Sequence, residues 1–208
     1  METRFKYPRT YHLPWSLGST NDDKFVKSLD PFLDMDIVVT IKKDGENFSG
    51  YSDGFHARSL DSKEHKSRKW IKEFWNSRKH DVPSGFRICG ENLYAKHSIY
   101  YDNLKSYFMG FSIWNNDLCL SWKETLEWFS LLDIEPVEVI YEGKFNEDIL
   151  KNLVNSIDLN KEEGYVIRNK NEFLYNDFST NVAKFVRQNH IQTSDHWIHQ
   201  EIIPNKLI

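Results

Sequence analysis

Short apolar runs separated by Asp-Gly pairs constrain the fold of this chain more than any other feature of its sequence. The runs 36–41, 47–51 and 55–60 follow one another closely. Asp44-Gly45 stands between the first two, and Asp53-Gly54 between the second and third. Asp-Gly between strand-like runs is a strong hairpin signal. We therefore predict consecutive antiparallel strands rather than a doubly wound parallel sheet.

The rest of the sequence alternates predicted strands with predicted helices. Helical periodicity and a capping Asn146 predict helices over 64–78, 122–132 and 146–156. Apolar runs predict further strands over 86–92, 107–114, 136–140, 164–168, 172–175 and 182–186. No repeat or linker interrupts the chain, so we predict one α+β domain over 1–208. Residues after about 190 are expected to form a short C-terminal helix and tail.

Charge is close to balanced over the whole chain but uneven along it. Lys and Arg number 27 against 31 Asp and Glu, which argues against a uniformly basic nucleic-acid coat protein. The segment 58–80 nevertheless holds eight basic residues against three acidic ones. This segment is a candidate surface for a phosphate backbone, and a solvated helix face is the alternative.

Several classes of protein are excluded by missing signals. No apolar run approaches the ~18 residues that span a bilayer, and the first residues do not form a secretory signal. Two cysteines, Cys89 and Cys119, are too few for a disulfide scaffold, so we expect a cytoplasmic location. Gly45 and Gly50 have the spacing of a phosphate-binding loop, but the Lys-Ser/Thr pair is absent. His196 and His199 lack a third zinc ligand and are expected to be a surface pair.

Lys42, at the end of the strand 36–41 and just before Asp44-Gly45, is the strongest candidate for covalent chemistry. A lysine amine attacks only when it is neutral, and its ordinary pKa is ~10.4. We predict that Lys43 or a bound metal, together with partial burial, lowers the pKa of Lys42. The alternative is a turn that carries two solvated lysines.

Five further motifs follow Lys42-x-Asp44-Gly45 along the chain, each near a strand end: Ala57-Arg58-Ser59, Gly90-Glu91-Asn92, Gly110-Phe111-Ser112, Glu163-Gly164-Tyr165-Val166 and Lys184-Phe185-Val186-Arg187. This ordered set resembles the motif series of covalent nucleotidyltransferases, which include ATP-dependent DNA ligases, RNA ligases and mRNA capping enzymes. Asp44-Gly45-Glu46-Asn47 and the opening Tyr7-Pro8-Arg9-Thr10 are most similar to small ATP-dependent RNA ligases of phages and related viruses.

The resemblance implies catalytic roles for three residues. Lys42 would attack the α-phosphate of ATP and hold AMP as a phosphoamidate. Lys184 would pair with the same phosphate, and Glu163 would help to hold Mg²⁺, with Mn²⁺ as an alternative. Val186 stands where relatives carry a second Lys, and the two-residue period of a strand turns Arg187 to the opposite face from Lys184.

The resemblance also implies nucleotide-binding roles, beside Lys184, for three residues of the middle motifs. Arg58 would position a phosphate or the ribose, and Glu91 would contact the ribose hydroxyls. Phe111 would stack on adenine, with Phe108 as the alternative.

The fold that the resemblance implies is the nucleotidyltransferase, ATP-grasp-like, fold of antiparallel sheets with flanking helices. No OB-fold is expected, because only about twenty residues follow the last motif. The implied function is an ATP-dependent RNA ligase that acts on nicked or broken RNA ends, without a membrane, in the cytoplasm or a viral host's cytoplasm. The resemblance also leaves open a partnership with an end-healing kinase or phosphatase. Alternatives are a GTP-using capping enzyme, a minimal DNA ligase and a non-catalytic RNA-binding domain of the same fold.

Overall fold

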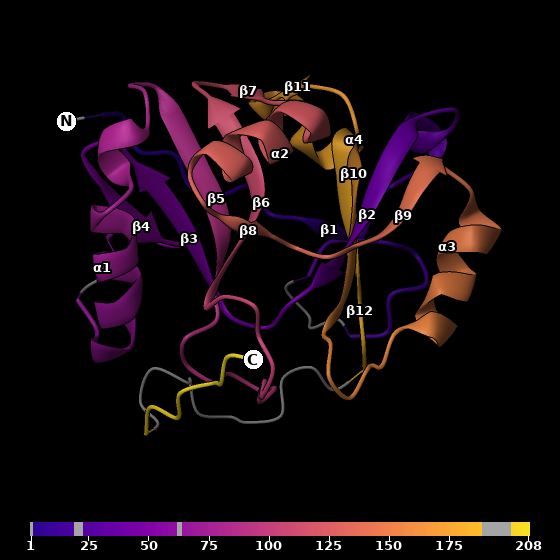
Figure 1. Cartoon of the computed structure of the whole chain (residues 1–208). Helices are drawn as coiled ribbons and strands as arrows, with labels where there is room; N and C mark the ends of the chain where they lie inside the picture. Colours follow the sequence, from indigo (N-terminus) through magenta and orange to yellow (C-terminus); the bar gives the residue numbers. More distant parts are fainter. Residues whose placement is uncertain (1, 19–22, 62–63, 189–200) are drawn as a thin grey trace.

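The computed structural model of the chain describes residues 2–18, 23–61, 64–188 and 201–208, which form two β-sheets. Sheet A has the strand order β1 (Tyr11–His12), β12 (Val182–Val186), β10 (Gly164–Asn169), β2 (Asp36–Lys42) and β9 (Val139–Lys144). Sheet B has the order β11 (Phe173–Leu174), β7 (Leu118–Cys119), β6 (Phe108–Asn115), β5 (Phe86–Asn92), β3 (Glu46–Tyr51) and β4 (Gly54–Ala57), and β8 (Glu135–Pro136) pairs with β6. Figure 1 shows sheet B on the left and sheet A on the right.

The helices are α1 (Lys69–Asn76), α2 (Trp122–Leu131), α3 (Glu147–Leu153) and α4 (Phe178–Asn181). Helix α1 flanks sheet B and helix α3 flanks sheet A on their outer sides, whereas α4 lies between the two sheets (Figure 1). Short 3-10 helices are η1 (Asp30–Phe32), η2 (Lys66–Arg68), η3 (Lys79–Asp81), η4 (Val154–Ser156) and η5 (Tyr175–Asp177). The predicted cap of α3 is confirmed, because Asn146 Oδ1 accepts a hydrogen bond from Ile149 N at 3.0 Å. The expected α+β class is likewise confirmed.

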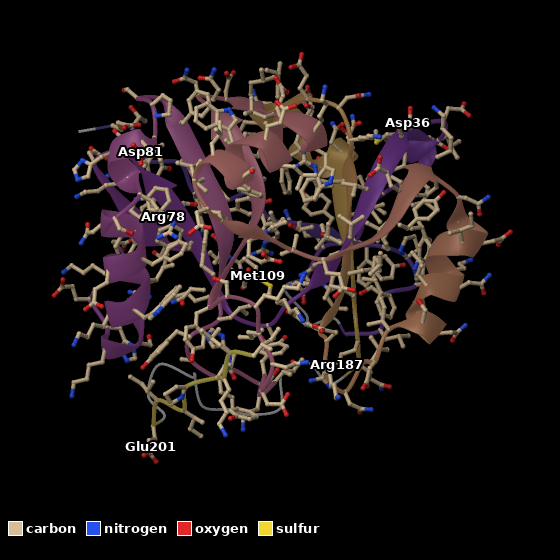
Figure 2. The ribbon with its side chains drawn as sticks, in the orientation of Figure 1. Asp36, Arg78, Asp81, Met109, Arg187 and Glu201 are labelled. Atoms are coloured by element: carbon tan, nitrogen blue, oxygen red, sulfur yellow. The ribbon has the colours of Figure 1, made fainter. Side chains whose placement is uncertain are left out.

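Apolar packing forms layers on both sides of each sheet. Leu150 of α3 packs with Ile37 and Val39 on the outer face of sheet A. Trp75 of α1 and Phe129 of α2 belong to the cluster on the outer face of sheet B. Between the sheets, Val38 of β2 shares a cluster with Met109 of β6, and Figure 2 labels Met109 at this central position. The two inner faces therefore pack together over part of their area.

The predicted hairpin between 36–41 and 47–51 is wrong. β2 pairs with β10 and β9 in sheet A, whereas β3 pairs with β4 and β5 in sheet B. Asp44-Gly45 therefore lies where the chain crosses from one sheet to the other. Asp-Gly is a local signal, whereas the choice of a strand partner depends on which faces are buried. The second predicted turn, Asp53-Gly54, does join two paired strands, β3 and β4.

Other boundaries differ by a few residues. The predicted strand 136–140 is divided between β8 in sheet B and β9 in sheet A. The predicted strand 55–60 ends at Ala57, and the predicted helix 64–78 is reduced to η2 and α1. The helix expected after His190, with His196 and His199, lies outside the described residues. Among the helices that are described, none has the length and apolar character needed to cross a bilayer.

Candidate active site

A pocket of about 450 Å³ opens between the inner faces of the two sheets. Its walls come from β2, β10 and β12 of sheet A and from β3, β5, β6, β7 and β11 of sheet B. All six residues predicted as site residues line it: Lys42, Arg58, Glu91, Phe111, Glu163 and Lys184. The structure therefore brings together residues that are up to 142 positions apart in the sequence.

Sheet A fixes the lysine and the carboxylate against each other. Lys42 is the last residue of β2, and its register partner in β10 is Gly164, so Glu163 lies beside it. Lys42 Nζ donates to Glu163 Oε2 at 2.6 Å, and Glu163 N donates to the Lys42 carbonyl at 3.1 Å. Both residues are thus held by main-chain and side-chain contacts, with the Glu163 side chain 9% exposed.

The predicted lowering of the Lys42 pKa is wrong for this structure. Burial does lower the pKa, but the carboxylates of Glu163 and Glu91 outweigh it and leave the pKa raised. Lys43 is predicted to lower the pKa of Lys42 through its positive charge, but the Lys43 ammonium is itself paired with the Glu162 carboxylate. In the protein alone Lys42 is therefore a protonated member of an ion pair.

For Lys184 and Glu91, unlike Lys42, burial decides the direction in which the pKa shifts. Burial, reinforced by the neighbouring charges of Lys42 and Arg58, lowers the pKa of Lys184 to about 8. Burial also raises the pKa of Glu91 to about 8, although Lys42 acts against it. Perturbed groups gathered in one cleft are typical of functional sites.

Sheet B supplies the residues predicted to bind the nucleoside. Glu91 lies near the end of β5, opposite Asn47 of β3, and Arg58 directly follows β4. Phe111 of β6 lies on the pocket wall, where Tyr7 meets its ring edge-on at 5.2 Å between centroids. Phe108, the alternative stacking residue, is buried in the core on the other side of sheet B and does not line the pocket.

Sequence reasoning missed the contribution of Asn47 and of the opening segment. Asn47 Oδ1 lines the pocket, is buried and has no hydrogen-bond partner among the described residues. Tyr7-Pro8-Arg9-Thr10 forms part of the wall, and burial raises the pKa of Tyr7. Both segments carried the resemblance without being given a role. An orphaned acceptor in a pocket is the kind of atom that a bound hydroxyl or amino group satisfies.

The carboxylates of the pocket suit a divalent metal that arrives with its ligand. Across the described part of the chain, no group of three or more His, Cys, Asp or Glu side chains is placed to hold a metal ion alone. Mg²⁺ keeps several waters and takes one or two carboxylates together with substrate phosphates. Glu163, with Glu91 lining the same pocket from the other sheet, fits that requirement.

The basic segment 58–80 is only partly available for RNA. Arg68 makes a two-pronged ion pair with Glu46 of β3, Lys72 pairs with Glu64 at 2.7 Å and Arg78 with Asp133 at 2.8 Å. Lys66 and Lys69 remain exposed at the start of α1.

Arg187, labelled in Figure 2, is not on the pocket wall, in agreement with the predicted alternation along β12.

Two facing sheets thus enclose a pocket that is lined from both, with a lysine at the crossover between them. Comparison with known proteins gives the family. The sequence model described as RNA ligase matches residues 35–186, which is well over half of the chain. The chain therefore belongs to the RNA ligase family, as the resemblance implied. No curated protein sequence matches it.

Solved structures share the fold. A putative ATP-dependent DNA ligase from Aquifex aeolicus is 18% identical to this chain, with a TM-score of 0.59. The match covers 88% of this chain and 50% of the ligase chain. An archaeal ATP-dependent RNA ligase is 13% identical, with a TM-score of 0.59 and coverages of 88% and 48%. A Naegleria gruberi RNA ligase with PPi is 18% identical, with a TM-score of 0.56 and coverages of 89% and 62%. The chain thus spans between about half and three fifths of these proteins.

Proposed function

We propose that this chain is the nucleotidyltransferase domain of an ATP-dependent RNA ligase that works through a covalent lysyl-AMP on Lys42. The observation that carries the proposal is the position of Lys42 at the crossover between the sheets. There its amine faces a pocket that also holds Glu163 and the second lysine, Lys184. Family membership and the names of the structural relatives, ATP-dependent ligases among them, support the same assignment.

The proposed reaction has three steps. The Lys42 ammonium first gives a proton to solvent, and the neutral amine then attacks the α-phosphorus of ATP. A P–N bond forms, the bond to pyrophosphate breaks, and a second proton leaves the nitrogen for solvent. An RNA 5′-phosphate oxygen then attacks the same phosphorus, which breaks the P–N bond and caps the RNA with AMP. Finally a 3′-hydroxyl attacks the RNA 5′-phosphorus, and AMP leaves as the strand is sealed.

Pocket residues from both sheets would position the nucleotide for this sequence. Lys184 would stabilise charge that develops on the α-phosphate, as a preorganised cation. Phe111 would stack on the adenine, Glu91 would contact the ribose hydroxyls and Arg58 would hold a phosphate. When bound, Mg²⁺ or Mn²⁺ neutralises phosphate charge, and Glu163 is the residue proposed to hold it. A Naegleria gruberi RNA ligase variant similar in fold is described with ATP and Mn.

RNA is proposed to reach the pocket over the start of α1. Lys66 and Lys69 are the exposed basic residues there, and Arg58 lies on the pocket wall itself. The source of the RNA, the viral or cellular setting and a partnership with end-healing enzymes stay predictions from the resemblance.

A DNA ligase is a second candidate, because a putative ATP-dependent DNA ligase matches the fold as well as an archaeal RNA ligase does. Nicked duplexes that differ only in whether the broken strand is RNA or DNA separate the two. We expect sealing of the RNA strand. Preferential sealing of the DNA strand would move the assignment to DNA ligation.

Labelling tests the covalent step directly. The protein is incubated with α-labelled ATP and Mg²⁺ and then denatured, for wild type, Lys42→Ala and Lys43→Ala. Lys43, the neighbouring lysine paired with Glu162, is the matched control. We expect label on wild type and Lys43→Ala but none on Lys42→Ala. Label from GTP alone would indicate capping chemistry, and no label from protein freed of bound AMP would favour the non-catalytic alternative.

A further inference from the structure

Asn205, far in the sequence from every motif, is a buried polar residue that forms hydrogen bonds through both its side chain and its main chain. It is 1% exposed. Its Nδ2 donates to the Leu93 carbonyl at 2.7 Å, and its Oδ1 accepts from Tyr101 N at 2.9 Å. Its main-chain N donates to the Tyr94 carbonyl at 2.9 Å, and its carbonyl accepts from Tyr107 OH at 3.0 Å.

These four hydrogen bonds all end on the segment 93–107, which joins β5 to β6. They reach its beginning, its middle and its end, so one residue ties the whole connection into a fixed shape. The segment 201–208 adds main-chain bonds to the same connection, from Lys96 N to the Ile203 carbonyl and from Leu104 N to the Lys206 carbonyl. Figure 1 shows this segment, in yellow, beneath the connection at the bottom of the molecule.

The connection in turn holds the residues that follow Lys42. Asp44 Oδ2 accepts from Ser98 N at 2.7 Å, from Ser98 Oγ at 2.5 Å and from Ile99 N at 3.0 Å. Asp44 N donates to Tyr101 OH at 2.9 Å. Tyr101 therefore touches Asp44 through its hydroxyl and Asn205 through its main-chain N–H. Lys42 is two residues from Asp44, at the point where the chain leaves sheet A.

We propose that Asn205 is a positioning residue for Lys42, acting through the connection 93–107 and Tyr101 to fix Asp44. The inference rests on the proposed function of Lys42 and extends it to a residue 163 positions away in the sequence. In-line attack requires the amine to be aligned with the phosphorus at about 3–3.5 Å, and a misplacement of about 1 Å caused by a distant change can cost about a hundredfold in rate. The crossover residues 43–45 lie between β2 and β3, so the hydrogen bonds that hold Asp44 come from the connection 93–107.

The test compares Asn205→Ala with Asn181→Ala, Tyr101→Phe and the double variant Asn205→Ala/Tyr101→Phe. Asn181 is the matched control, because it is also buried, while its hydrogen bonds within the described part of the chain go to Asn169, Asp177 and Thr180 rather than to the connection. For each variant we measure kcat and KM for lysyl-AMP formation at a temperature where it is fully folded. Hydrogen exchange of the Ser98 and Ile99 amides is measured in parallel, without nucleotide.

We expect Asn205→Ala to lower kcat about tenfold or more with little change in KM for ATP, and to speed exchange of both amides. Tyr101→Phe should lower kcat similarly, and the double variant should be little slower than either single one, because both act on one path. Unchanged exchange at Ser98 and Ile99, equal slowing by Asn181→Ala, or multiplicative effects would overturn the proposal. If wild type forms no lysyl-AMP, the proposed function fails, while the exchange measurement still decides whether Asn205 fixes the loop.

Discussion

The two sheets contribute differently to the pocket. Sheet A carries Lys42 on β2 and Lys184 on β12, and Glu163 immediately precedes β10, the strand that pairs with both. Sheet B carries Glu91 and Phe111 on β5 and β6, and Arg58 just beyond the end of β4. The residues proposed to act on the α-phosphate or its metal thus belong to sheet A, whereas those proposed to hold the nucleoside or a further phosphate belong to sheet B. Substitutions in sheet A should therefore affect kcat, and those in sheet B should affect KM.

Lys184→Ala is the sharpest test of the sheet A side. Loss of one preorganised cation costs ~3 kcal/mol of transition-state stabilisation, so kcat for lysyl-AMP formation should fall about a hundredfold. KM for ATP should change far less. Lys184→Arg keeps the charge and serves as the control. A raised KM with unchanged kcat would place Lys184 among the binding residues and break the division between the sheets.

The variants Gly164→Ala, in β10 of sheet A, and Gly54→Ala, in β4 of sheet B, compare how tightly the two sheets are packed at glycines with the same φ. Both glycines have φ of +154°, a value that residues with a side chain rarely adopt, so both variants carry a cost from φ. A Cβ at Gly164 would lie 2.1 Å from the Phe185 carbonyl oxygen, whereas one at Gly54 would meet only the end of the Arg4 side chain at 3.3 Å.

We therefore expect Gly164→Ala to lower the free energy of unfolding by about 2–3 kcal/mol more than Gly54→Ala does. Urea unfolding of both variants measures the difference. Equal losses would mean that sheet A is not the more tightly packed support of the nucleophile.

Phe111→Ala tests the sheet B side. Base stacking on an aromatic ring contributes about 1–3 kcal/mol, so KM for ATP should rise roughly tenfold or more while kcat at saturation changes little. Phe111→Tyr keeps the ring and should keep the wild-type KM. A kcat defect without a KM defect would contradict the assignment of Phe111 to binding.

The smallest expected effect concerns RNA rather than ATP. The double variant Lys66→Glu/Lys69→Glu should reduce the slope of log Kobs against log salt by roughly 1–2 for RNA, because each phosphate contact contributes about 0.7 for single strands. Lys123→Glu, on α2, is the control and should leave the slope unchanged. An unchanged slope in the double variant would remove the start of α1 from the RNA path.

Much of the site could be predicted because its residues sit in short ordered motifs near strand ends. All six predicted residues line the pocket, although their individual roles remain proposals. The assignment of β2 and β3 to different sheets could not be predicted, because Asp44-Gly45 reports only local geometry. The raised Lys42 pKa depends on Glu163, which lies 121 residues away. The bonds of Asn205 likewise join it to residues about a hundred positions earlier, with no local pattern to reveal them.

Mapping of the nucleotide by mass spectrometry tests the central claim most directly. The protein is incubated with ATP and Mg²⁺, digested under conditions that preserve a phosphoamidate and sequenced by fragmentation. We predict AMP on the side chain of Lys42 and on neither Lys43 nor Lys184. AMP on one of those two lysines, or no modified peptide from protein that seals RNA, would contradict the proposed nucleophile.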